Sequence, residues 1–347
     1  MAISITGKKI RITDKTIMNI FRLNNNIDIY CLNKIISYLE KIGVDNFEVD
    51  KKWMVRYGTL ISNKFIMRIR FLTDIELIKK MNINEVVINI KNPKFNTILS
   101  KLIEQNVNIT IEYEAENIDE LEQLKNYIFL KNIKKINRII ISNLSNISVE
   151  SEWKKIIESF KEKTGFFVDV YPFDSFCSAT STAIESAISF ADGIICAFNG
   201  IEGKKNVAPL EEVIAYLSLI INKNNEDLSI LQDLKNLYYQ VTKIEIDKSK
   251  PIIGDNIFLV ESGIHIDGIL KNPNTYEPYN PLSVGIKRGF VLGKHSGRKA
   301  IVEKLKEYKI NYENIDIDML LKTIKENKIT INNKYEAESV IKLLNMK

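Results

Sequence analysis

Short runs of β-branched and other apolar residues recur along the first two thirds of the chain, and amphipathic stretches lie between them. Eight runs predict strands: Lys9–Thr13, Asn46–Val49, Phe65–Arg70, Glu85–Ile90, Val107–Glu112, Ile136–Ser142, Phe166–Val170 and Gly193–Phe198. Helical patterns separate them, for example Leu32–Ile42, Val149–Lys163 and Pro209–Ile221. This alternation predicts a (β/α)8 TIM barrel. A doubly wound open sheet is the structural alternative, because it has the same alternation.

The alternation stops after Asn222. One more helix is predicted for Asn224–Thr242, whereas Lys-Pro, Asn-Pro and Glu-Pro steps break up Ile244–Asn280 and predict an irregular linker. Three short amphipathic patterns follow and predict helices: Gly297–Tyr308 with Ser296 as N-cap, Ile317–Asn327 and Tyr335–Asn345.

These boundaries predict three parts. Residues 1–222 form the barrel, 223–280 form a helix and a linker arm, and 281–347 form a small, mainly helical subdomain.

The amino-acid composition indicates the broad class of protein. With 45% hydrophobic and 27% charged residues, the chain has the composition of a soluble globular protein. No apolar run reaches the roughly 20 residues that a membrane span needs, and the first residues lack the pattern of a signal peptide. We therefore expect a cytoplasmic protein without a membrane partner. Its three cysteines, Cys31, Cys177 and Cys196, are widely spaced and are expected to be reduced thiols.

The net charge of +5 comes from 49 basic and 44 acidic residues that are spread along the chain. Without a basic block or interleaved aromatic residues, the sequence does not predict nucleic-acid binding. A mild positive charge still favours a phosphate-bearing ligand such as a CoA thioester.

Both histidines of the chain, His265 and His295, lie within one short stretch near the C-terminal end. Histidine titrates near neutral pH and is the usual residue for moving protons in an active site. Acid–base chemistry is therefore expected in this stretch. Judged from its local sequence alone, His265 would also fit a structural role, hydrogen-bonded in a turn.

Three segments resemble the homocitrate synthase and isopropylmalate synthase family. They are ESGIHIDGILKNPNTYEPYNP at Glu261–Pro281, LGKHSGR at Leu292–Arg298 and APLEEV at Ala208–Val213. The resemblance is strong from Ala208 to Arg298 and weak over the first 200 residues. It implies a condensation of acetyl-CoA with a 2-oxo acid, in which a divalent cation chelates the oxo acid.

The barrel departs from the family at the positions that bind this metal. Where the family has a metal-binding Asp, a substrate-binding Arg, a Glu, two His and an Asn, this chain aligns Asn19, Met18, Phe21, Tyr171, Phe173 and Val207, with Asn206 one place out of register. An amide, a phenol and a phenyl ring are poor ligands for a hard divalent cation. We therefore expect no metal on this chain and no condensation by its barrel alone.

The C-terminal motif, in contrast, is intact. The resemblance implies that His265 and Tyr276 are catalytic residues that reach the active site of a neighbouring subunit and assist proton transfer. Tyr276 also fits a packing role in a proline-bounded loop. We expect His295 to be mostly structural, and Glu261 and Asp267 to orient the loop or His265.

Together these features predict a subunit of a split homocitrate synthase, similar to omega subunits of nitrogen-fixing anaerobes. A catalytic alpha-type subunit would carry the divalent metal, and acetyl-CoA and 2-oxoglutarate would meet at the shared site. The product homocitrate would serve the nitrogenase iron–molybdenum cofactor. A non-catalytic regulatory or scaffolding homologue is the alternative. An autonomous synthase for another 2-oxo acid is disfavoured, because the metal ligands are missing.

Overall fold

The computed structural model describes residues 3–5, 7–144, 150–203, 205–221, 227–331 and 333–345. The chain divides into two compact units, Met1–Ile246 and Asp247–Lys347. The predicted boundary between 222 and 223 lies outside the described residues.

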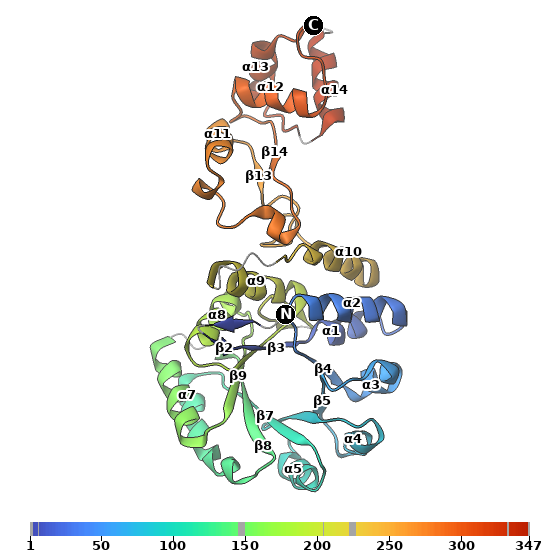
Figure 1. Ribbon diagram of the computed structural model, residues 1–347, viewed down its shortest axis with the longest axis vertical. Coiled ribbons are helices and arrows are strands. Elements are labelled where there is room, and N and C mark those ends of the chain that lie inside the picture. The colour runs from blue at the N-terminus through green and yellow to red at the C-terminus, as the bar shows by residue number, and fades with distance from the viewer. Residues whose placement is uncertain are drawn as a thin grey trace. The chain divides into compact units, whose positions relative to one another are not determined.

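The first unit is a closed barrel of eight parallel strands (Figure 1). In barrel order the strands are β10 (Gly193–Cys196), β3 (Arg11–Asp14), β4 (Asn46–Asp50), β5 (Phe65–Ile69), β6 (Glu85–Asn89), β7 (Asn108–Glu114), β8 (Ile136–Ser142) and β9 (Phe167–Tyr171). The barrel closes where β10 pairs with β3, with Cys196 opposite Asp14. The predicted (β/α)8 barrel is confirmed, and the open sheet is excluded by this closure.

Helices surround the barrel. They are α1 (Thr16–Leu23), α2 (Ile29–Lys41), α3 (Lys51–Tyr57), α4 (Glu76–Lys80), α5 (Phe95–Ile103), α6 (Ile118–Glu122), α7 (Glu150–Thr164), α8 (Ala179–Ser189), α9 (Leu210–Ala215) and α10 (Ile230–Thr242). Helix α2 shows why they form, since Asp28 caps its first turn and Leu32, Ile35 and Leu39 are buried on one face.

Short elements complete the description. Two-residue strands are β1 (Ser4–Ile5), β2 (Lys8–Lys9), β11 (Ile201–Glu202), β12 (Lys205–Asn206), β13 (Leu259–Val260) and β14 (Gly289–Phe290). Short 3₁₀ segments are Gly58–Leu60, Leu72–Asp74, Gln123–Asn132, Phe198–Gly200, Pro273–Thr275 and Pro281–Val284, and Tyr216–Ile221 is a π-helical continuation of α9.

One predicted boundary at the start of the first unit was wrong. The first barrel strand begins at Arg11, because Lys8–Lys9 pairs with β1 in a separate hairpin. Helix α10 begins at Ile230, and the start predicted at Asn224 lies outside the described residues. Helix α10 buries Leu231 and Leu234 and packs against α2, so it belongs to the barrel unit and not to the linker arm.

The second unit contains α11 (Gly263–Lys271), α12 (Arg298–Glu307), α13 (Ile317–Glu326) and α14 (Lys334–Asn345). The last three confirm the predicted C-terminal helices. Their shared core is apolar and includes Leu292, Ile301, Leu305, Leu320 and Ile324. Helix α11 lies inside the stretch that was predicted to be irregular. The proline steps flank this helix, and Ile266 and Ile269 are buried on its inner side.

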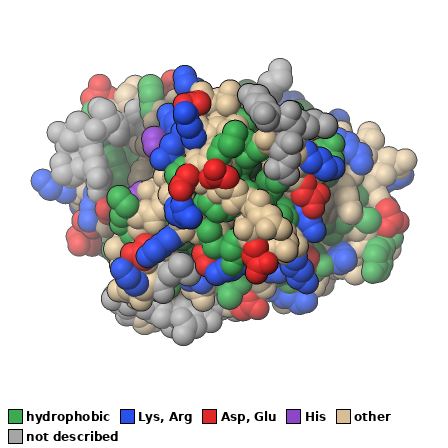
Figure 2. Space-filling model, turned by 90° about the horizontal axis from the view of Figure 1, so that it is seen from above, with side chains coloured by type: hydrophobic (Ala, Val, Ile, Leu, Met, Phe, Trp, Pro, Cys, Tyr) green, Lys and Arg blue, Asp and Glu red, His purple; other side chains and the backbone are tan. Residues whose placement is uncertain are grey.

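On the face shown in Figure 2, basic and acidic side chains are interspersed, without a large patch of one sign. Among the described helices, none has the length and apolarity to cross a membrane.

Candidate functional site

Ionic contacts of the protein itself line the mouth of the barrel, around a cavity of about 450 Å³. Lys15 directly follows β3, and its Nζ donates to Glu48 Oε1 at 2.8 Å. The same ammonium lies 4.5 Å from the centre of the Tyr171 ring. The side chains of Lys15 and Glu48 are only 5% and 4% exposed. A fixed, buried cation thus lies against Tyr171, one of the positions aligned with the family's metal ligands.

Arg68 on β5 extends this network across the barrel. Its guanidinium bridges two buried carboxylates, Glu48 on β4 and Glu112 on β7. Burial acts to raise the pKa of Glu48, but Arg68 and Lys15 outweigh it and lower this pKa to about 2. The cluster of Lys15, Glu48, Arg68 and Glu112 is called the mouth network below.

The other positions aligned with the family's ligands are also committed to structural contacts. Asn19 Oδ1 accepts from the Gly203 N–H at 3.0 Å, and Asn19 Nδ2 lies 3.4 Å from the Tyr238 hydroxyl. The Lys205 ammonium lies 3.9 Å from the centre of the Phe173 ring, and Val207 is fully buried.

Tyr171 keeps its proton. Burial and the nearby Glu202 raise the pKa of Tyr171 well above its usual range. Its hydroxyl donates to Glu202 Oε2 at 3.0 Å. A protonated phenol engaged as a donor is not the anionic ligand that a metal ion would need.

These side chains do not fit the divalent cation that the family resemblance implies. Among the described residues, no group of three His, Cys, Asp or Glu side chains is placed to hold a metal ion. The guanidinium at the family's substrate-binding position is replaced by the buried thioether of Met18.

Asp14, at the end of β3, titrates at an unusual pH. It is fully buried and accepts a hydrogen bond from the Thr16 N–H at 2.8 Å. Burial raises the pKa of Asp14 to about 7, although the hydrogen bonds from Thr16 and Ile17 oppose this. The folded protein therefore retains a proton that an unfolded chain loses near pH 4.

A pH prediction follows for Asp14→Asn. Because the folded-state pKa is raised, the stability linked to this proton is complete below about pH 4 and is lost as the pH rises through about 7. Relative to the parent protein, Asp14→Asn should gain stability over this window, by at most about 4 kcal/mol. Urea unfolding at several pH values between 4.5 and 7.5 measures the gain. A difference between the two proteins that stays constant with pH would refute the assignment.

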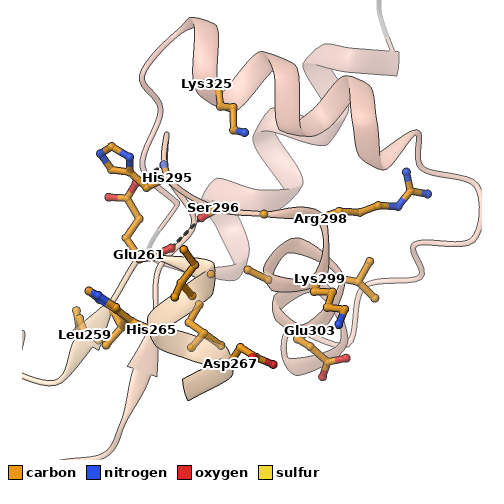
Figure 3. A pocket seen from close by; sticks show the side chains of 18 of the residues that line it. Leu259, Glu261, His265, Asp267, His295, Ser296, Arg298, Lys299, Glu303 and Lys325 are labelled. Atoms are coloured by element: carbon orange, nitrogen blue, oxygen red, sulfur yellow. Dashed lines mark hydrogen bonds between the residues drawn. The ribbon is translucent and has the colours of Figure 1, made fainter. Parts of the chain in front are cut away.

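In the second unit, hydrogen bonds of Glu261 and Ser296 join the segments Glu261–Pro281 and Leu292–Arg298. Glu261 Oε1 accepts from the His295 N–H at 2.8 Å, and the Ser296 hydroxyl donates to the Glu261 carbonyl at 3.3 Å (Figure 3). The Gly293 N–H donates to Ser296 Oγ at 3.0 Å. A Cβ at position 293 would lie 2.5 Å from Glu261 Cδ, so a larger residue there would displace the Glu261 carboxylate.

This arrangement corrects the predicted role of Ser296. The residue before α12 is Gly297, and it has no side-chain cap. Ser296 does not cap the helix, because its hydroxyl is engaged with Glu261 and Gly293. Asp267 pairs with Lys271 at 2.6 Å rather than with His265.

The structure brings the two predicted catalytic residues together. The rings of His265 and Tyr276 lie 4.5 Å apart between centroids, at an interplanar angle of 43°. Both side chains are exposed, Tyr276 to 44%. No hydrogen bond joins the His265 imidazole to another described residue. The structural role considered above, a histidine hydrogen-bonded in a turn, is therefore not what the described residues show.

Gly268 makes the ring contact possible, and the sequence analysis missed it. It follows His265 by three residues on α11, which places both on one face of the helix. A Cβ at position 268 would lie 2.4 Å from Tyr276 Cε2. The available signal was a glycine three residues after His265 in the segment Gly263–Lys271.

The loop that carries Tyr276 is anchored by the next residue. Glu277 is buried, and its two carboxylate oxygens accept from Arg288 Nε and Nη2 at 2.7 and 2.8 Å. Such a two-bond pair fixes orientation as well as distance. Tyr276 therefore has a defined position against α11.

Beside this pair lies a hollow of about 1460 Å³ (Figure 3). Its lining comes from β13, α11, the turn before α12, and α12 and α13. The ionisable residues in it are Glu261, His265, Asp267, Lys271, His295, Arg298, Lys299, Glu303 and Lys325. An exposed imidazole next to a phenol, at the edge of a large hollow, can take a proton from a bound molecule while the phenol donates a hydrogen bond.

Fold and site together define a (β/α)8-barrel protein with an exposed imidazole–phenol pair on a separate helical unit. A domain described as "Homocitrate synthase post-HMGL domain-like" matches residues 252–330. The homocitrate synthase omega subunit of Clostridium pasteurianum is 32% identical over 336 residues, which cover 95% of this chain and 93% of that one. The chain belongs to the homocitrate synthase and isopropylmalate synthase family.

One further relative and one solved structure show how the likeness is distributed. Homocitrate synthase AksA of Methanocaldococcus jannaschii is 31% identical over 208 residues, which cover 59% of this chain and 51% of that protein. Hydroxymethylglutaryl-CoA lyase of Pseudomonas aeruginosa superposes with a TM-score of 0.55 at 12% identity, over 69% of this chain and 94% of that one. The second likeness shows the barrel fold alone.

Proposed function

We propose that this chain is one subunit of a split homocitrate synthase and supplies His265 and Tyr276 in trans to the barrel of a partner chain. The reaction joins acetyl-CoA, 2-oxoglutarate and water to give homocitrate and CoA. Homocitrate then serves as the organic ligand of the nitrogenase iron–molybdenum cofactor. The partner is an alpha-type subunit that holds the divalent metal, and both chains work in the cytoplasm.

The ring pair of His265 and Tyr276 carries this proposal. It is exposed, and it lies on a unit of its own at the edge of a large hollow. The cavity at the chain's own barrel mouth is lined by the ion pairs of Lys15 and Arg68, and the described residues around it include no ligand set for a divalent metal. A reacting oxo acid therefore needs another barrel, and the relative named as an omega subunit supports a partner.

The chemistry required of this chain is proton transfer. A proton next to a thioester carbonyl is weakly acidic, so its removal needs a positioned base, and His265 is the base. The Tyr276 hydroxyl donates a hydrogen bond to the negative charge that develops on the thioester oxygen. A divalent metal held by the partner would supply the polarisation of the oxo acid's ketone.

Reconstitution tests the proposal. This chain alone should show no condensation of acetyl-CoA with 2-oxoglutarate, with or without added divalent metal, because its barrel mouth lacks the ligands. Mixing it with the metal-bearing partner should produce homocitrate at a rate at least about tenfold above the sum of the separate chains, since the base arrives with this chain. Release of CoA measures the rate.

Two results would contradict the proposal. Metal-dependent turnover by this chain alone would make it an autonomous synthase. A partner that is fully active by itself would leave this chain with a scaffolding or regulatory role.

A further inference from the structure

A short turn, residues 272–275, joins α11 to Tyr276. The N–H groups of Tyr276 and Glu277 both donate to the Pro273 carbonyl, at 3.1 and 3.0 Å. The chain therefore doubles back, and the Tyr276 ring packs against Gly268 of the helix that it has just left. This turn alone does not hold the ring against the helix, because the loop can still rotate about it.

The second connection is the ion pair of Glu277 with Arg288. Arg288 directly precedes β14, and β14 pairs in parallel with β13. Strand β13 in turn leads into α11, the helix that carries His265. The ion pair thus closes a circuit of covalent and hydrogen-bonded links that starts at Tyr276 and returns to the helix of His265.

The two strands in this circuit belong to the folded core of the second unit. Two backbone hydrogen bonds, of 3.2 and 3.0 Å, join β14 and the residue after it to β13 and the residue before it. Val260 and Phe290, one from each strand, pack against the apolar core of α12, α13 and α14. The pair of Glu277 and Arg288 therefore connects the Tyr276 loop to that core.

The geometry of this pair sets it apart from an ordinary surface ion pair, which contributes little. Both carboxylate oxygens of Glu277 bind the Arg288 guanidinium, at 2.7 and 2.8 Å, and the Glu277 side chain is only 6% exposed. Two parallel hydrogen bonds to a planar group fix direction as well as distance. Tyr276, which is 44% exposed, depends on its backbone for its position, because little packing surrounds its own side chain.

We propose that Glu277 and Arg288 are positioning residues that assemble the His265–Tyr276 pair within this chain, before a partner binds. They act through Tyr276 by fixing the loop that carries it. The inference rests on the proposed function, because the assembled rings serve catalysis only if they take a proton from the thioester. Assembly in advance lowers the entropy that is lost in ordering side chains when two subunits meet.

Nuclear magnetic resonance of the full-length chain without a partner tests the assembly. The chain has two histidines, so selective labelling gives two imidazole signals, which His295→Gln assigns. An aromatic ring displaces the resonance of protons close to it, so Tyr276→Leu should move the His265 signal alone. Arg288→Met combined with Glu277→Gln should move it in the same direction, because this double variant removes the ion pair without stranding a buried carboxylate. An unchanged His295 signal shows that the unit stays folded.

The matched control is Lys322→Gln combined with Glu326→Gln, which removes an exposed ion pair of 3.8 Å from α13 and should leave both signals in place. Arg288→Lys keeps the charge without the two-bond geometry, so its shift should be intermediate, and it is the deciding variant if the double variant unfolds. The inference is overturned if Tyr276→Leu leaves the His265 signal unmoved, since the rings then do not meet in the free chain. It is equally overturned if only Tyr276→Leu moves that signal.

Kinetics of the reconstituted synthase show whether the position matters to the reaction. Arg288→Met with Glu277→Gln should lower kcat by about tenfold or more, because a small displacement of a catalytic group is costly. In a Tyr276→Phe background the same double variant should lower kcat by less than about twofold further, because the hydroxyl that it positions is already absent. Equal factors in the two backgrounds would overturn the positioning role.

Failure of this inference and failure of the proposed function give different results. If the His265 signal responds to the double variant while His265→Ala leaves the rate unchanged, the rings are assembled as inferred but this chain does not catalyse. If His265→Ala abolishes synthesis while the His265 signal ignores the double variant, the histidine acts in trans and the ion pair does not place the phenol.

Discussion

Replacing His265 by Ala should lower kcat of the reconstituted synthase by about 10²–10⁴-fold, the usual contribution of a positioned general base. The imidazole is exposed and forms no hydrogen bond to another described residue, and its ring contact with Tyr276 lies on the surface. Its removal should therefore leave the thermal stability of the chain and its association with the partner unchanged. The measurement is CoA release by the pair at saturating substrates.

The controls separate catalysis from scaffolding. Tyr276→Phe keeps the ring that packs against Gly268 and removes only the hydroxyl, so it should reduce kcat less than His265→Ala does. Lys322→Gln on the same unit should leave kcat unchanged. An unaltered rate for His265→Ala would support the scaffolding alternative.

The second large effect concerns stability. Arg68→Met should destabilise the chain by about 3–5 kcal/mol, because it leaves the buried carboxylates of Glu48 and Glu112 without the guanidinium that bridges them. The Arg68 side chain is 13% exposed, so water compensates little of this loss. Urea unfolding at neutral pH measures the change in the free energy of unfolding.

A neighbouring arginine provides the control. Arg70 is 46% exposed and lies 3.4 Å from Asp50, so Arg70→Met should cost less than about 1 kcal/mol. Replacing Arg68 by Met together with Glu112→Gln should recover part of the loss, because Glu112 then carries no charge and Glu48 keeps its ion pair with Lys15. Equal effects of Arg68→Met and Arg70→Met would show that the mouth network contributes little.

The barrel was predictable from local sequence because its strands are buried on both sides. Such strands appear as short apolar runs, and helices with apolar residues at helical spacing separate them. Helix α11 was missed for a physical reason. Proline steps on either side of it indicate breaks, but they exclude a helix only where they stand, and none stands between Gly263 and Lys271.

The mouth network was not predictable in this way. Lys15, Glu48, Arg68 and Glu112 lie far apart in the sequence, and barrel closure brings them together. The contact between His265 and Tyr276 similarly depends on Gly268, whose effect is visible only once the loop folds back on α11. Residue types in the sequence indicated which side chains were candidates for the site, but only the folded structure shows which of them are in contact.

Lys15 has a consequence for the evolution of this barrel. Reverting Asn19, Tyr171 and Phe173 to the family's ligands would bring a divalent ion towards an ammonium that is already buried against Tyr171. Like charges at short range repel strongly where water is excluded. No single reversion restores metal binding until Lys15 is also replaced, and replacing it alone unbalances Glu48. Epistasis between these positions therefore keeps this barrel from regaining a metal site one substitution at a time.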